Sequence, residues 1–206
     1  TFTYYRASPI GSSSRKGSLT KEQLYSTRNY REKNLDQVAF RGCDLRDFEF
    51  SGQCLGLFSN CDLKGAQFVD ASFTHSLSGY YSSLPFDGPT AGTRGLSGTY
   101  GISASNMTAE QFYSTRTYKS KELPAGLVLR NMDLSGWDFS HMDLRYVLFH
   151  GSSLKGAILT DARGGLFQLA RDLTLEQIKT MSNYKDGKQT SGDGFSLPKE
   201  LITAIT

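Results

Sequence analysis

The chain has 206 residues, of which 38% are hydrophobic and 21% are charged, and its formal net charge is only +3. This composition allows an apolar core in one elongated domain or two small ones. The small net charge argues against a dominant role with nucleic acid or membrane. No apolar run approaches the roughly 18 residues that cross a bilayer. We therefore expect no membrane span and no nucleic-acid partner.

Residues 1–18 end in a Gly, Ser and basic stretch, which we interpret as a tail or linker. Three copies of one segment then recur along the chain, beginning at Leu19, Met107 and Leu173. The first two copies are identical at ten of seventeen positions, which indicates an internal duplication.

Each copy opens with the same helix-start signal. A threonine fits the N-cap and a glutamine follows three residues later, so that each residue satisfies a backbone donor of the other in a capping box. The predicted caps are Thr20 with Gln23, Thr108 with Gln111, and Thr174 with Gln177. We expect a helix at each copy, stabilised by about 1 kcal/mol through its cap.

Large apolar residues recur at every fifth position after the first two copies. The first block has Leu35, Phe40, Leu45, Phe50 and Leu55, then, after a slip of three residues, Phe58, Leu63, Phe68 and Phe73; the second block has Leu129, Leu134, Phe139, Leu144, Phe149, Leu154 and Leu159. A period of five fits neither a helix nor a strand. It does fit a chain that turns a corner after each pentad and stacks its coils around one core. These residues are the predicted core.

The pentads CDLRD (43–47), CDLKG (61–65), MDLSG (132–136), WDFSH (137–141) and MDLRY (142–146) resemble the pentapeptide-repeat proteins, whose pattern is approximately A(D/N)LXX. The resemblance implies a mainly β fold, a right-handed quadrilateral β-helix in two short blocks with capping α-helices. It also implies that the aspartate of each pentad is structural. The slip between Leu55 and Phe58 departs from the pattern, and we expect a bulge or distorted face there.

These signals divide the chain into a tail (1–18), a helix with the first block (19–75), a Gly-, Ser- and Tyr-rich connection (76–106), a helix with the second block (107–165) and a C-terminal helical cap (166–206). Open ends of a solenoid expose strand edges and an apolar bore, so the first and third helices are expected to cover them. The middle helix implies either two separately capped blocks or a helix that leans on the side. We favour two short modules packed together.

No catalytic or cofactor motif is recognisable: the sequence has no nucleophile elbow, no phosphate-binding glycine loop and no C-x-x-C pair. His141 and His150 lie near Asp138 and Asp143, where a metal or acid–base site is conceivable, although we favour a solvated face. We predict no enzymatic activity, no metal and no cofactor. The odd count of three cysteines, Cys43, Cys54 and Cys61, favours free thiols. The compartment stays open between cytoplasmic and secreted bacterial, with reduced thiols favouring the cytoplasm.

Arg28 and Tyr30 of the first copy recur as Arg116 and Tyr118 in the second. One hypothesis is a duplicated ligand patch. The alternative, which we favour, is that the tyrosines pack each helix onto its coil while the arginines face solvent.

The leading functional hypothesis is a non-enzymatic solenoid scaffold that binds another macromolecule, most simply a protein, through its flat sides or through residues 76–106. One alternative is the targeting or substrate-binding part of a larger secreted bacterial effector. Another is a DNA mimic that inhibits topoisomerases, a role that a short rod of charge +3 suits badly. The sequence leaves the partner and the oligomeric state open.

Overall fold

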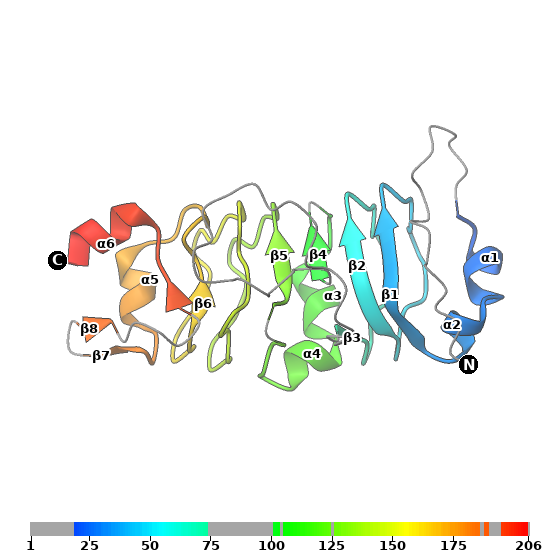
Figure 1. Cartoon of the computed structure of the whole chain (residues 1–206), viewed down its shortest axis with the longest axis horizontal. Helices are drawn as coiled ribbons and strands as arrows, with labels where there is room; N and C mark the ends of the chain where they lie inside the picture. Colours follow the sequence, from blue (N-terminus) through cyan, green and yellow to red (C-terminus); the bar gives the residue numbers. More distant parts are fainter. Residues whose placement is uncertain are drawn as a thin grey trace, which may run out of the picture.

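The computed structural model describes residues 19–73, 101–103, 105–124, 126–185, 188–189 and 195–205. The predictions for residues 1–18, for His75 and for most of 76–106 lie outside the described residues. Figure 1 shows the elements following one another along the long axis of the molecule, from α1 and α2 at one end to α5 and α6 at the other.

The helices are short, and each of the three predicted helix starts carries a capping box in the structure. Their bounds are α1 Lys21–Tyr25, α2 Arg28–Arg31, α3 Ala109–Tyr113, α4 Arg116–Lys119, α5 Leu175–Lys179 and α6 Lys199–Ile205. The first two copies differ from the expected single helix, because Thr27 and Thr115 each cap a second one. Their hydroxyls accept from the backbone N–H of Tyr30 and Tyr118, so each copy is a helix pair.

One parallel sheet connects the two blocks. Its strands are β1 Asn34–Arg41, β2 Cys54–Ser59, β3 Ser72–Phe73, β4 Gly101–Ser103 and β5 Val128–Arg130, in the order β1-β2-β4-β5 with β3 also on β2. Near the C-terminus, β6 Gly165–Leu166 pairs in parallel with β9 Phe195–Ser196, and β7 Tyr184–Lys185 pairs antiparallel with β8 Lys188–Gln189. Strand β4 falls within the segment expected to be a patternless connection, and it joins the blocks into one continuous wall.

Pentads outside these strands pair in parallel with residues eighteen to twenty-one positions further along the chain. In the second block Asp133 pairs with Ser153 and Asp138 with Ile158, twenty residues or four pentads apart. In the first block Asp44 pairs with Asp62, eighteen residues apart. We call the stretch between two such paired positions a layer.

Ten pentads of the described residues end in a hydrogen-bonded turn. The N–H of Trp137 donates to the carbonyl of Leu134 at 3.1 Å, and Gly136, the third residue of the turn, has a φ of 70°. A type II turn requires a positive φ at this position, which glycine adopts without strain. The same position has positive φ in ten corners: Asp47, Gly52, Gly65, Asp70, Gly136, His141, Tyr146, Gly151, Gly156 and Asp161. Five of the 21 glycines of the chain therefore occupy these corners.

The recurring apolar side chains fill the interior. All twelve residues named as structural core are at most 1% exposed: Phe40, Leu45, Phe50, Leu63, Phe68, Leu129, Leu134, Phe139, Leu144, Phe149, Leu154 and Leu159. They belong to one hydrophobic cluster that spans both blocks. Phenylalanines of successive layers stack, with ring centroids 5.4 Å apart for Phe50 and Phe68. Full burial of such a side chain contributes about 1.5–3 kcal/mol.

The slip in the first block corresponds to a missing corner. Strand β2 runs without a turn through both Leu55 and Phe58. Opposite it, the pairing of β1 with β2 shifts register between Leu35 and Ala39. Strand β1 keeps a step of five residues from Leu35 to Phe40, opposite a step of three residues from Leu55 to Phe58 in β2, so the distance between paired residues falls from twenty to eighteen.

Candidate interaction surface

The aspartate that precedes each central apolar residue holds its own corner. Its carboxylate accepts a hydrogen bond from the backbone N–H two residues further on, an arrangement known as an Asx turn. The pairs are Asp44 with Arg46 (3.2 Å), Asp62 with Lys64 (3.1 Å), Asp133 with Ser135 (3.0 Å), Asp138 with Ser140 (2.8 Å) and Asp143 with Arg145 (3.0 Å). These side chains therefore lie outward in ordered positions, fixed by the backbone that they stabilise.

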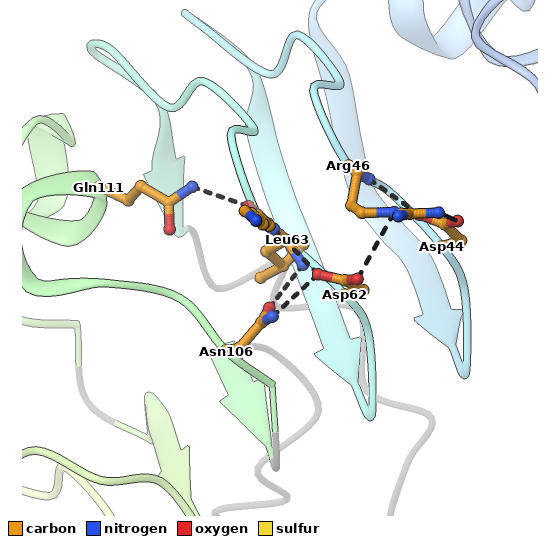
Figure 2. A network of polar contacts seen from close by, with 7 residues as sticks. Asp44, Arg46, Asp62, Leu63, Asn106 and Gln111 are labelled. Carbon is orange, nitrogen blue, oxygen red and sulfur yellow. Dashed lines mark hydrogen bonds and ion pairs between the residues drawn. The ribbon is translucent and has the colours of Figure 1, made fainter.

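Stacking of layers brings the carboxylates of Asp44 and Asp62 close together on the first block. The guanidinium of Arg46 and the side-chain amide of Asn106 compensate these negative charges (Figure 2). Arg46 Nε donates to Asp44 Oδ1 at 2.8 Å and lies 3.6 Å from Asp62 Oδ2. Asn106 Nδ2 donates to Asp62 Oδ1 at 2.8 Å. We call Asp44, Arg46, Asp62 and Asn106 the charged ladder. Its three charged side chains are 43–56% exposed, so they are ordered yet open to solvent.

The charged ladder keeps its carboxylates ionised. Hydrogen bonds from Arg46 lower the pKa of Asp44 to about 2. The hydrogen bond from Asn106 is the main cause that lowers the pKa of Asp62. Sequence analysis did not single out Arg46 or Asn106, because they lie far apart in the chain and only the stacking of layers brings them to one surface.

Helix α3 lies against the same side of the first block. Gln111 Nε2 donates to the carbonyls of Leu63 and Ala66, both at 2.8 Å, and Asn106 Oδ1 accepts from the N–H of Leu63 at 2.6 Å (Figure 2). Beside these contacts runs an open groove of about 530 Å³, whose lining includes Lys64 and Glu110. Its walls carry both signs of charge, which suits a polar partner better than an apolar one.

The structure places the residues of the hypothetical ligand patch in two separate positions. Tyr30 donates its hydroxyl to the carbonyl of Glu49 at 2.8 Å, and Tyr118 donates to the carbonyl of Asp138 at 3.0 Å. Burial is the main cause that raises the pKa of both hydroxyls to about 12. Arg28 is exposed and pairs with Glu32, and Arg116 is also exposed. Each tyrosine thus packs its own helix pair onto a layer, as the alternative to a ligand patch required.

The two described histidines, His141 and His150, occupy different positions on the surface. His141 occupies an exposed corner, with Nδ1 3.7 Å from Asp161 Oδ2. His150 is partly buried, and that burial lowers its pKa. Over the described ranges, no cluster of three or more His, Cys, Asp or Glu side chains could hold a metal ion.

All three cysteines are free thiols, and two of them lie in adjacent layers. Cys43 precedes Asp44 and Cys61 precedes Asp62, so the pairing of the aspartates brings the thiols together. Their mutual hydrogen bond lowers the pKa of Cys43 to about 6 and, together with burial, raises the pKa of Cys61. Cys61 is buried, which leaves Cys43 as the more accessible thiol of the pair.

Comparison with known families identifies repeats in the second block. The family model of pentapeptide repeats (8 copies) matches residues 126–161, which is most of the second block. That segment is therefore a run of pentapeptide repeats, as the resemblance indicated, and such repeats imply a β-helix-like solenoid. No curated protein matches the chain. Among the described residues, none of the helices has the length and apolar character needed to cross a membrane.

Proposed function

We propose that the chain is a non-enzymatic scaffold, a right-handed, four-sided β-helix in two short blocks with capping helices, whose outward rows bind another protein. Three features support the four-sided path: pairing at twenty residues, a corner after each pentad, and inward burial of each central residue. We keep the domain limits expected from the sequence as part of this proposal, and we add strand β4 to the wall that joins the two blocks.

The charged ladder is the observation that carries the binding proposal. Its side chains are held by Asx turns and ion pairs, so they lose little conformational freedom when a partner binds. Two aspartates bridged by one arginine favour a protein surface with complementary charges. A DNA mimic would instead need uncompensated carboxylates, and here Arg46 pairs with both Asp44 and Asp62. A role within a larger secreted effector would use the same surface.

The proposal of no enzymatic activity rests on the structural roles of the carboxylates and of His141. The pentad aspartates are engaged as backbone acceptors within turns. The nearest approach to an acid–base pair, His141 with Asp161, is solvent-exposed on both sides and has no adjacent nucleophile among the described residues.

The binding proposal is tested by affinity capture from an extract of the source cells. We compare the unaltered chain with Arg46→Glu and with Lys155→Glu, which occupies the corresponding pentad position in the second block. Capture of one protein by the unaltered chain and Lys155→Glu, but not by Arg46→Glu, supports the charged ladder as the site. Equal capture by all three contradicts it, provided that circular dichroism shows the variants folded.

A further inference from the structure

Two of the three helical copies dock on the preceding layer through the same glutamine. Gln111 Oε1 accepts from the N–H of Thr108 at 2.8 Å, while its Nε2 donates to the carbonyls of Leu63 and Ala66. Gln177 repeats this in the third copy, donating to the carbonyls of Leu154 and Ala157 at 2.8 Å. In both layers the accepting carbonyls belong to a central residue and to the residue three further on.

A second pair of contacts is also shared. The N–H of Asp70 donates to the carbonyl of Ser114, and the N–H of Arg116 donates to the carbonyl of Ala71. In the third copy, Asp161 donates to Thr180 and Ser182 donates to Ala162. These donors and acceptors occupy the same pentad positions in the two layers. Each copy therefore satisfies the exposed edge of a layer through one fixed set of four hydrogen bonds.

The first copy presents the same groups, and no layer lies in front of them among the residues that the structure describes. Gln23 Oε1 accepts from the N–H of Thr20 at 2.9 Å, but the Nε2 of Gln23 and the N–H of Arg28 have no hydrogen-bond partner among the described residues. Gln23, Ser26 and Thr27 are exposed, whereas in the second copy Thr115 is fully buried. We call Gln23, Ser26, Thr27 and Arg28 the open cap face.

We propose that the open cap face is a docking site for the edge of a further pentapeptide-repeat layer, supplied by another polypeptide segment. The chemistry of that edge is defined by the two docked copies: two corner carbonyls three residues apart, and an N–H and carbonyl pair at the next corner. Docking there extends the rod at its end, which goes beyond the binding of a partner along its sides.

Two other occupants fit this face less well. A second copy of the chain would have to offer its last layer, whose carbonyls at Leu154 and Ala157 already accept from Gln177. Residues 1–18 contain no pentad pattern. A separate repeat layer is the occupant that matches every group on the face.

The test uses a tandem chain in which residues 1–106 are followed by residues 19–206. Its junction, Asn106 to Leu19, reproduces the natural step from Asn106 to Met107, so the inner copy of the α1–α2 pair follows a layer. Hydrogen exchange at the Arg28 amide is then measured in both copies. We expect exchange at least about tenfold slower in the inner copy than in the outer one, because only the inner amide gains an acceptor.

The matched variant is Gln23→Glu, which keeps the oxygen that accepts from Thr20 and removes the Nε2 donor. In the inner copy, Gln23→Glu should bring the exchange rate of the Arg28 amide to within about twofold of the outer rate. The reason is that the two corner carbonyls of the layer would lose their donor, and a buried acceptor without a partner weakens the docking. In the natural chain, Gln23→Glu should leave the melting temperature unchanged, whereas Gln111→Glu should lower it.

Two outcomes would overturn the proposal. One is equal exchange at Arg28 in the inner and outer copies of a folded tandem chain. The other is that Gln23→Glu lowers the melting temperature of the natural chain as much as Gln111→Glu does, because the face would then already be covered by residues 1–18 or by a second copy. Neither outcome changes capture through Arg46, so failure here is separate from failure of the proposed function.

Discussion

Beyond the register shift in β1, the first repeat block pairs positions eighteen residues apart, whereas the second pairs positions twenty residues apart until its last layer, where Leu148 pairs with Leu166 and Ser153 with Arg171 at eighteen. Both blocks keep the buried central residues and the left-handed corner residues. What the first block gives up is one corner, where β2 continues straight from Leu55 to Phe58. The comparison teaches that a layer tolerates the loss of a turn as long as its inward side chains stay in phase with the layers on either side.

The missing corner requires a glycine at position 56. Gly56 lies in the straight part of β2, where a Cβ atom would meet the carbonyl oxygens of Val38 at 2.4 Å and of Asp36 at 2.6 Å. Both acceptors belong to β1 beside its register shift. The close approach of these two backbones is possible only because residue 56 has no side chain. At the corners of both blocks, by contrast, glycine provides the positive φ.

The largest expected effect is that of Phe139→Asp in the second block. Phe139 is fully buried, so the variant loses an aromatic core side chain and places a charge without a partner inside, at a cost of more than about 4 kcal/mol. We expect the second block to unfold, as measured by circular dichroism and limited proteolysis. Thr160→Asp, at an exposed corner, is the control. An unchanged melting curve for Phe139→Asp would contradict the inward register.

Gly56→Ala should cost about 3 kcal/mol, since backbone oxygens rather than flexible side chains block the new methyl group. The control is Gly136→Ala, where φ is +70° and a Cβ meets nothing within 4 Å. Only the strain of the left-handed conformation remains there, about 1 kcal/mol. Urea denaturation of the two variants checks the difference. Equal losses would show that the missing corner needs no close approach.

Tyr118→Phe and Tyr30→Phe should each cost about 1 kcal/mol, the usual net value of a hydrogen bond. Both tyrosines donate to a backbone carbonyl, of Asp138 in one block and of Glu49 in the other. Similar losses in thermal unfolding would show that the two helix pairs are attached equivalently. A loss confined to one variant would mean that the blocks use their helix pairs differently.

The smallest effect concerns pH and the charged ladder. Because Arg46 lowers the pKa of Asp44 to about 2 in the folded chain, while an unperturbed aspartate titrates near about 3.9, the stabilisation is complete above pH ~4 and is lost as the pH falls towards 2. In Arg46→Ala the carboxyl titration of Asp44, followed by NMR, should move up towards the unperturbed value. A midpoint that stays at about 2 would show that the backbone N–H alone lowers the pKa.

The core could be predicted from the sequence because burial in a pentad is decided locally. Leu134, for example, carries its own corner glycine two residues on, and Asp133 caps the same turn. Strand β4 could not be predicted in this way. Its only large apolar residue, Ile102, stands five residues before Met107, which opens a helical copy rather than a run of pentads. The position of the strand follows instead from its pairing with β2 and β5.

On the surface, too, some features could be predicted from neighbouring residues and others only from the fold. Thr20 and Gln23 are three residues apart, so their capping box is readable from sequence. The break before α2 also has a local signal, because Thr27 is the N-cap of α2. The sequence of this segment is equally compatible with one continuous helix, so this signal alone does not predict the break. The charged ladder required the stacking of layers, because Arg46 and Asn106 meet only through Asp62.

The wall that passes through β4 also has a mechanical consequence. Strands β1 and β2 are joined by five registered residue pairs, whereas β4 is joined to each of its neighbours by three. Tension along the long axis therefore meets its narrowest cross-section on that side at Gly101–Ser103. Within this wall, a rod stretched from its two ends should yield first at this seam, which is formed by three residues outside the predicted repeat blocks.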